Sequence, residues 1–188
     1  FSVLTFSVIW TSIDDLYMII PRGDYYRQGK SVVLLLGLAK IFDAATSVNG
    51  NILGYSPKFR FNLYFMLFLA VVNTALNILF IPRFNIMGAA LATMISIMCY
   101  NILKFLFILK EYKLSPFTNK TTYVLLLGGI AFILGEIIPM PFHPIVNIGV
   151  RSALIGSFLI LTIYRLKLSP DINDILRKLL KRVGIRLP

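Results

Sequence analysis

The stretch FNLYFMLFLAVVNTALNILFIPRFNIMGAALATMISIMCYNILKFLFIL, residues 61–109, decides the fold of this chain. The apolar blocks on either side of Pro82 are each about twenty residues long, the length that an α-helix needs to cross a hydrocarbon core of roughly 30 Å. A transmembrane barrel would alternate apolar and polar residues, whereas FMLFLAVV does not alternate. Because only helices and closed barrels satisfy the backbone in lipid, the stretch predicts two membrane-spanning helices, 61–81 and 86–109.

Similar apolar segments occupy most of the remaining sequence, and they predict further spans at 1–20, 31–55, 121–138 and 145–164. Of the 188 residues, 57% are hydrophobic and 14% are charged, and the mean hydropathy is +0.80. Soluble domains have about 45–50% apolar and about 25% charged residues. We therefore expect an all-α, polytopic transmembrane helix bundle. The apolar start at Phe1 lacks the features of a signal peptide, which suggests a fragment cut inside or just before a membrane helix.

The chain is strongly basic, with 19 Lys and Arg against 8 Asp and Glu and a formal charge of +11. In a soluble protein this would suggest nucleic acid as a partner. In a membrane protein, basic residues gather in cytoplasmic loops and near anionic headgroups, so we expect membrane lipid and no nucleic acid. Residues 167–188 combine an apolar stripe with basic residues and are too polar to span. They predict a C-terminal amphipathic interfacial helix that anchors the chain or recruits a partner protein.

The distribution of basic residues between the loops predicts the orientation in the membrane. The larger basic set lies on the side of the C-terminus and the smaller on the opposite side, so the C-terminus is expected in the cytoplasm and the loops 82–85 and 139–144 outside. The larger set comprises Lys58, Arg60, Lys110, Lys113, Lys120, Arg165, Lys167 and the tail; the smaller comprises Arg22, Arg27, Lys30, Arg83 and Arg151.

No group of residues with the spacing of a known catalytic or metal site is evident in the sequence. Cys99 and His143 are each the only residue of their type, and both are interpreted as structural. Asp14 and Asp15 are adjacent, so on a helix their side chains point about 100° apart and suit a shared site poorly. We expect transport or structure rather than catalysis, with no cofactor and no metal.

Charged and polar side chains share one face of the predicted span 31–55. Lys40 and Asp43 stand three residues apart near its middle, where an isolated charge costs roughly 2.5–3.5 kcal/mol on insertion scales. Ser47, Asn51 and Gly54 continue the same stripe. One interpretation is a translocation cavity in which Lys40 attracts a phosphate or an acidic sugar. The other is a self-neutralised pair that fixes helix packing.

Three further groups of polar or small residues lie in the spans 61–81 and 86–109. Asn73 and Asn77 are four apart, and they either line the same cavity or form interhelical hydrogen bonds. Lys104 lies near the cytoplasmic end of its span and is expected to extend to the interface. The third group is a ridge of small residues spaced four apart, which favours close helix packing: Gly88, Ala92 and Ser96.

The segment LNILFIPRFNIMGAALATMIS, Leu76–Ser96, closely resembles the hallmark of polysaccharide flippases of the multidrug/oligosaccharidyl-lipid/polysaccharide exporter superfamily. In that family a helix ends in an Ile-Pro-basic-aromatic turn and the next helix begins with Gly-Ala-Ala-x-Ala-Thr. Val32–Phe65 is similar to the preceding helix pair, and Leu114–Phe117 (LSPF) to a cytoplasmic loop. The resemblance covers most of residues 21–117.

The resemblance implies the C-terminal helices of a MATE-like, fourteen-helix transporter in the bacterial cytoplasmic membrane. Residues 1–109 would belong to its second lobe, 110–166 would form an additional helix pair, and Lys40 and Arg60 would lie in a central cationic cavity. Two lobes would rock around this cavity to move undecaprenyl-pyrophosphate-linked oligosaccharide or a similar polysaccharide precursor, for O-antigen, capsule or exopolysaccharide synthesis. Two alternatives stay open: a drug/cation antiporter of the same superfamily, and a membrane enzyme or scaffold that acts with polysaccharide-assembly proteins.

Overall fold

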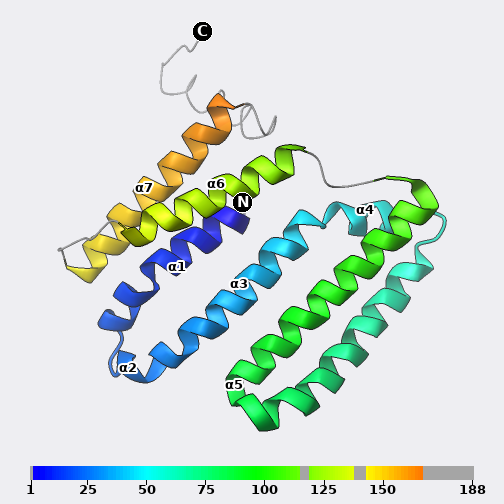
Figure 1. Cartoon of the computed structure of the whole chain (residues 1–188), viewed down its shortest axis with the longest axis horizontal. Helices are drawn as coiled ribbons and strands as arrows, with labels where there is room; N and C mark the ends of the chain where they lie inside the picture. Colours follow the sequence, from blue (N-terminus) through cyan, green and yellow to red (C-terminus); the bar gives the residue numbers. More distant parts are fainter. Residues whose placement is uncertain (1, 115–118, 138–142, 167–188) are drawn as a thin grey trace.

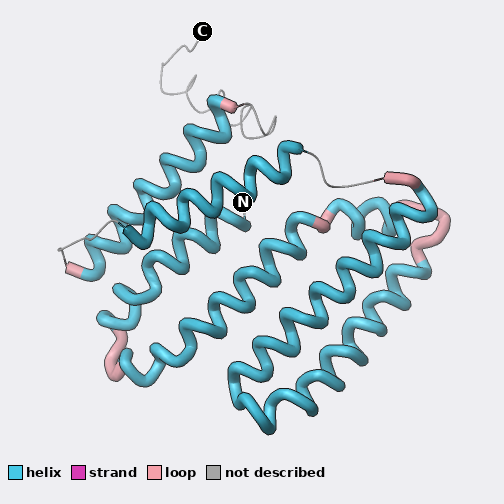
Figure 2. The backbone as a smooth tube through the Cα atoms, in the orientation of Figure 1, coloured by secondary structure: helices cyan, strands magenta, loops and turns pink. Residues whose placement is uncertain are grey.

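A computed structural model describes residues 2–114, 119–137 and 143–166. Within these ranges every regular element is a helix, as Figures 1 and 2 show, which confirms the predicted all-α class for the described part of the chain. The elements in chain order are α1 (Ser2–Ile19), α2 (Gly23–Tyr26), η1 (Arg27–Gly29), α3 (Lys30–Ala45), α4 (Val48–Gly54), α5 (Arg60–Tyr112), α6 (Asn119–Ile137) and α7 (Pro144–Arg165).

The long helices lie side by side across the molecule (Figure 1). Helix α1 packs against α7, α6 and α3, while α3 and α4 pack against α5. The side chains of Ala131, Ile155 and Leu159 form a buried apolar cluster where α6 and α7 meet. Helix α1 therefore contacts both parts of the molecule, one formed by α6 and α7 and the other by α3, α4 and α5.

Helix α5 is a hairpin rather than one straight rod. Asn85 has a positive φ of 51° with ψ of −131°, a non-helical conformation that divides the helix three residues after Pro82. Proline removes a backbone donor and clashes with the preceding turn, and asparagine tolerates a positive φ better than most residues. The far ends of the two arms meet, since the rings of Phe61 and Phe107 are 4.8 Å apart. The break at Asn85 falls within the segment 82–85, where the sequence predicts a turn between 61–81 and 86–109.

The two arms of α5 differ in burial. The first arm, residues 60–84, contains no buried residue, and it forms one edge of the molecule in Figure 1. On the second arm, residues 86–112, the whole ridge of small residues is buried: Gly88, Ala92 and Ser96. A Cβ on Gly88 would lie 2.3 Å from the carbonyl oxygen of Phe80. Glycine at this position therefore allows the two arms to approach closely at the turn.

The predicted span 31–55 is not one continuous helix, and the structure corrects this expectation. Helices α3 and α4 are bent by 49° at a break around Thr46 and Ser47. The Thr46 hydroxyl donates a hydrogen bond to the carbonyl oxygen of Phe42 at 2.9 Å. Hydroxyl and amide side chains compete in this way for backbone groups, and the sequence TSVNGN concentrates poor helix formers at this point. The sequence analysis did not predict the break because the residues on both sides of it are apolar.

Among the described residues, two helices are long and apolar enough to cross a membrane: α5 and the segment Pro144–Ile163 of α7. A third is added if the bent α3–α4 pair is counted as one span. Since 53 helical residues would extend about 80 Å at 1.5 Å each, α5 spans one bilayer only as a folded-back pair of arms. Helix α1, which carries Asp14 and Asp15, and the shorter apolar segment Thr121–Ile137 of α6 fall short of the same criteria. The predicted interfacial tail, 167–188, lies outside the described residues.

Candidate functional site

One of the predicted cavity residues, Asp43, meets a partner from α5 at the interface of α3 and α5. The Asp43 carboxylate accepts a hydrogen bond from Nδ2 of Asn101 at 2.9 Å. It also lies 3.9 Å from the Lys40 ammonium, at the outer limit of an ion pair. Asn101 is 1% exposed, whereas the Lys40 side chain is 72% exposed. Asp43 therefore joins a buried amide on one helix to an accessible ammonium on its own helix.

Lys40 stands at the edge of an apolar groove between α1 and α3. This groove has a volume of about 360 Å³, and its lining includes Phe6 and Ile9 of α1 and Leu36 of α3. Gly37 makes room for the Phe6 ring, since a Cβ there would lie 2.1 Å from ring carbons. One ammonium beside apolar walls suits a ligand with an apolar chain and an anionic group.

The other residues of the predicted stripe lie at the helix break or beyond it. Ser47 and Asn51 are exposed, and a 49° bend lies between α3, which carries Asp43, and α4. Arg60, the first residue of α5, is also exposed. The structure therefore brings Lys40 and Asp43 together, but not Ser47, Asn51 or Arg60 with them.

Asn73 and Asn77 lie on the first arm of α5. Nδ2 of Asn77 donates to Oδ1 of Asn73 at 3.3 Å, so they pair within one helix. In Figures 1 and 2 the second arm of α5 lies between the first arm and α3. Both side chains are half-buried. In this arrangement the two asparagines do not share the groove of Lys40.

A second polar cluster, between α1 and α7, was missed at the sequence level. The Asp15 carboxylate accepts from Nδ2 of Asn147 at 3.1 Å and lies 3.3 Å from Nη1 of Arg151. The Arg151 guanidinium also donates to the backbone carbonyl of Thr11. The side chains of Arg151 and Asp15 are only 16% and 10% exposed. The sequence does show that Asp15 and Arg151 are charged residues in apolar segments. It does not indicate that α1 and α7, which carry them, are neighbours.

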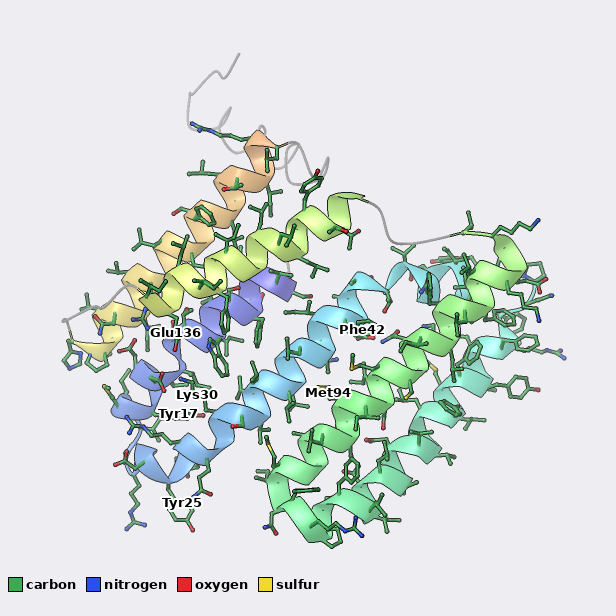
Figure 3. The ribbon with its side chains drawn as sticks, viewed as in Figure 1. Tyr17, Tyr25, Lys30, Phe42, Met94 and Glu136 are labelled. Carbon is green, nitrogen blue, oxygen red and sulfur yellow. The ribbon has the colours of Figure 1, made fainter. Side chains whose placement is uncertain are left out.

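The neighbouring carboxylate, Asp14, points toward a different helix. It accepts from the Lys30 ammonium, at the start of α3, at 2.6 Å. Lys30 also lies 5.0 Å from the centre of the Trp10 ring, and Figure 3 shows it beside Tyr17 where α1 and α3 meet. The two adjacent carboxylates thus bind two different helices, as their 100° separation on α1 requires.

The expectation that Lys104 extends to the interface is wrong. Lys104 is only 6% exposed, and its ammonium donates to the Tyr100 hydroxyl at 3.1 Å. The ammonium also lies 4.5 Å from the centre of the Tyr100 ring. Lys104 faces the interior because it lies on the buried side of the second arm of α5, four residues before the fully buried Ile108.

Within the described ranges, no three His, Cys, Asp or Glu side chains are grouped so that they could hold a metal ion. Compared with protein-family models, with curated proteins and with solved structures, the chain gives no match in any of the three.

Proposed function

We propose that this chain is part of a membrane flippase that moves a lipid-linked oligosaccharide or polysaccharide precursor across the bacterial cytoplasmic membrane by alternating access. The motif resemblance of Leu76–Ser96 supports this assignment. The structural observation that carries it is the accessible Lys40 ammonium at an apolar groove, held near Asp43, which contacts Asn101 of the next helix. Ionisable residues in apolar helices are costly, so they usually serve a function.

The groove has the two chemical features that such a precursor requires. Its walls are almost entirely apolar, which suits a polyprenyl chain, and Lys40 supplies a positive charge for a phosphate. Its volume of about 360 Å³ holds only part of such a ligand, so the glycan would extend beyond it. The break between α3 and α4 adds a position at which helix α3 can change direction.

The test is a translocation assay in vesicles that contain the full-length transporter, with Lys40→Met, Lys40→Arg and Asp43→Asn. Lys40→Met removes the charge and keeps most of the side chain, so translocation should fall at least about tenfold, the loss expected for one charge-assisted hydrogen bond. Lys40→Arg should retain most activity. Lys110→Met is the matched control, because Lys110 is exposed at the end of α5.

Unchanged translocation in both Lys40→Met and Asp43→Asn would refute the role of this groove. Ion-gradient-driven drug efflux, with no translocation of a lipid-linked precursor, would instead identify the antiporter of the same superfamily. The predicted cytoplasmic position of the C-terminus is part of the proposal and can be tested by labelling from either side of the membrane.

A further inference from the structure

Helices α1 and α3 run side by side in opposite directions (Figure 1), which determines what lies at each end of the groove between them. The ion pair of Asp14 with Lys30 marks one point of their register, and the seat of the Phe6 ring at Gly37 marks another. The first residues of α1 therefore lie beside Lys40, and both line the groove.

The groove is polar at this end and apolar over the rest of its lining. The polar lining residues are Ser2 and Thr5 of α1 and Lys40 of α3. The remaining lining residues are Phe6, Ile9, Val33, Leu36 and Gly37. This arrangement matches an amphiphile whose chain lies along the apolar walls and whose headgroup lies at Lys40.

The polar end carries charges of both signs. Asp43 stands three residues after Lys40 on the same helix face, and its Oδ2 lies 3.9 Å from the ammonium, which is longer than a hydrogen bond. Its Oδ1 accepts from Asn101, which holds the carboxylate in place. The side chains of Lys40 and Asp43 are 72% and 43% exposed, so a ligand can reach both. Among the described residues, Asp43 forms an ion pair with Lys40 alone.

These two charges restrict the class of ligand. A purely anionic headgroup at Lys40 would lie close to the Asp43 carboxylate, and the two negative charges would repel each other. A headgroup that also carries a cation would place this cation at Asp43 and form both contacts. Since the charges of Lys40 and Asp43 sum to zero, the site suits a zwitterion.

We propose that this groove binds a zwitterionic aminophospholipid of the phosphatidylethanolamine class. The phosphate accepts hydrogen bonds from the Lys40 ammonium, the primary ammonium of the lipid donates to Oδ2 of Asp43, and an acyl chain lies along the apolar walls. The inference rests on the proposed function for the role of the groove: the membrane lipid occupies it until the transported precursor displaces it. Binding at equilibrium needs no transport, so the two proposals can fail separately.

The experiment measures the unfolding temperature of the full-length protein in mixed micelles during addition of phosphatidylethanolamine, phosphatidylcholine or phosphatidylglycerol with identical acyl chains. A ligand that binds the folded state raises this temperature as its concentration increases. Phosphatidylcholine carries a cation without N–H donors, and phosphatidylglycerol carries no cation. Wild type should bind phosphatidylethanolamine about three- to tenfold more tightly than the other two, between the effects of an exposed ion pair and a charge-assisted hydrogen bond.

Two variants that nearly preserve side-chain size assign the two contacts. Asp43→Asn should remove the preference for phosphatidylethanolamine over phosphatidylglycerol, because it removes the charge that attracts the ammonium. Asp24→Asn, at an exposed carboxylate of α2, is the matched control and should leave the preference unchanged. Lys40→Met should weaken the binding of both lipids, because both lose the phosphate contact.

Equal affinities of the wild type for the three lipids would overturn the proposal, and tighter binding of phosphatidylglycerol would identify an anionic ligand instead. A preference for phosphatidylethanolamine that persists in Asp43→Asn would also overturn it. Loss of translocation in Lys40→Met without any headgroup preference would reject this inference and leave the proposed function standing. A clear preference for phosphatidylethanolamine with unchanged translocation would do the reverse.

Discussion

The buried ion pair of Asp15 and Arg151 should contribute more to stability than any other polar contact between α1 and α7. The perturbations are Asp15→Leu, Arg151→Met and the double variant. Each single variant leaves one charge in an interface where the side chains are 10% and 16% exposed. The remaining Arg151 would keep its contact with the Thr11 carbonyl, but that carbonyl cannot neutralise it.

Removing one partner of a buried pair costs about 3–5 kcal/mol, most of it from the uncompensated charge that remains. Replacing both partners by apolar residues removes that penalty, so the double variant should be less destabilised than the sum of the single variants. Contacting residues of this kind couple by about 0.5–3 kcal/mol, and the low exposure places this pair near the upper end. A coupling of about 2–3 kcal/mol is therefore expected.

The assay is reversible unfolding of the full chain in mixed micelles, for wild type and the three variants, evaluated as a double-mutant cycle. The control cycle uses the neighbouring pair of Asp14 and Lys30, whose side chains are 46% and 27% exposed. Solvent screens a pair of this exposure, so its coupling should stay at or below about 1 kcal/mol. Equal coupling in the two cycles, or additive effects of Asp15→Leu and Arg151→Met, would refute the reasoning.

Three further outcomes are expected. Gly88→Ala should destabilise the α5 hairpin, since its Cβ would lie 2.3 Å from the Phe80 carbonyl, while Gly129→Ala, with open space around its Cβ, should be neutral or slightly stabilising; chemical unfolding measures both. Asn101→Leu should cost about 1.5–3 kcal/mol because it removes a buried hydrogen bond to the Asp43 carboxylate, and Asn77→Leu, which breaks a contact within one helix, should cost less in the same measurement. In a variant without Cys99, cysteines at Phe61 and Phe107 should be joined by a short bifunctional thiol reagent, because the rings they replace are 4.8 Å apart; no cross-link would contradict the hairpin.

Local signals in the sequence, the prolines above all, indicate where helical segments end. Helix α1 ends at Ile19, two residues before Pro21, and the α5 hairpin turns at Asn85, three residues after Pro82; a proline removes a backbone donor and disfavours a continuous helix around it. The break at Thr46 was not predicted. It depends on a hydroxyl that bonds to its own backbone, an effect too small to outweigh the hydropathy of the flanking residues.

The sequence predicted only those contacts of the candidate site that join residues close together in the chain. Lys40 and Asp43 lie three residues apart, so helical periodicity places them on one face. Asn101, 58 residues from Asp43, and Arg151, 136 residues from Asp15, become partners only through helix packing. Hydropathy does not determine which helices are neighbours or how each is rotated. The same limit explains Lys104, whose burial depends on α4 covering it.

The two ion pairs of α1 also indicate which of its interfaces, with α3 or with α7, separates more easily. Helix α1 is tied to α7 by a buried pair with two additional hydrogen bonds, from Asn147 and to Thr11, and to α3 by a more exposed pair. A rearrangement that separates α1 from α3 breaks the weaker contact, and it opens the groove that Lys40 borders. Separation of α1 from α7 would leave a buried charge unpaired and would not open the groove beside Lys40. The balance of charges therefore favours motion at the α1–α3 boundary, with α1, α6 and α7 moving as one unit.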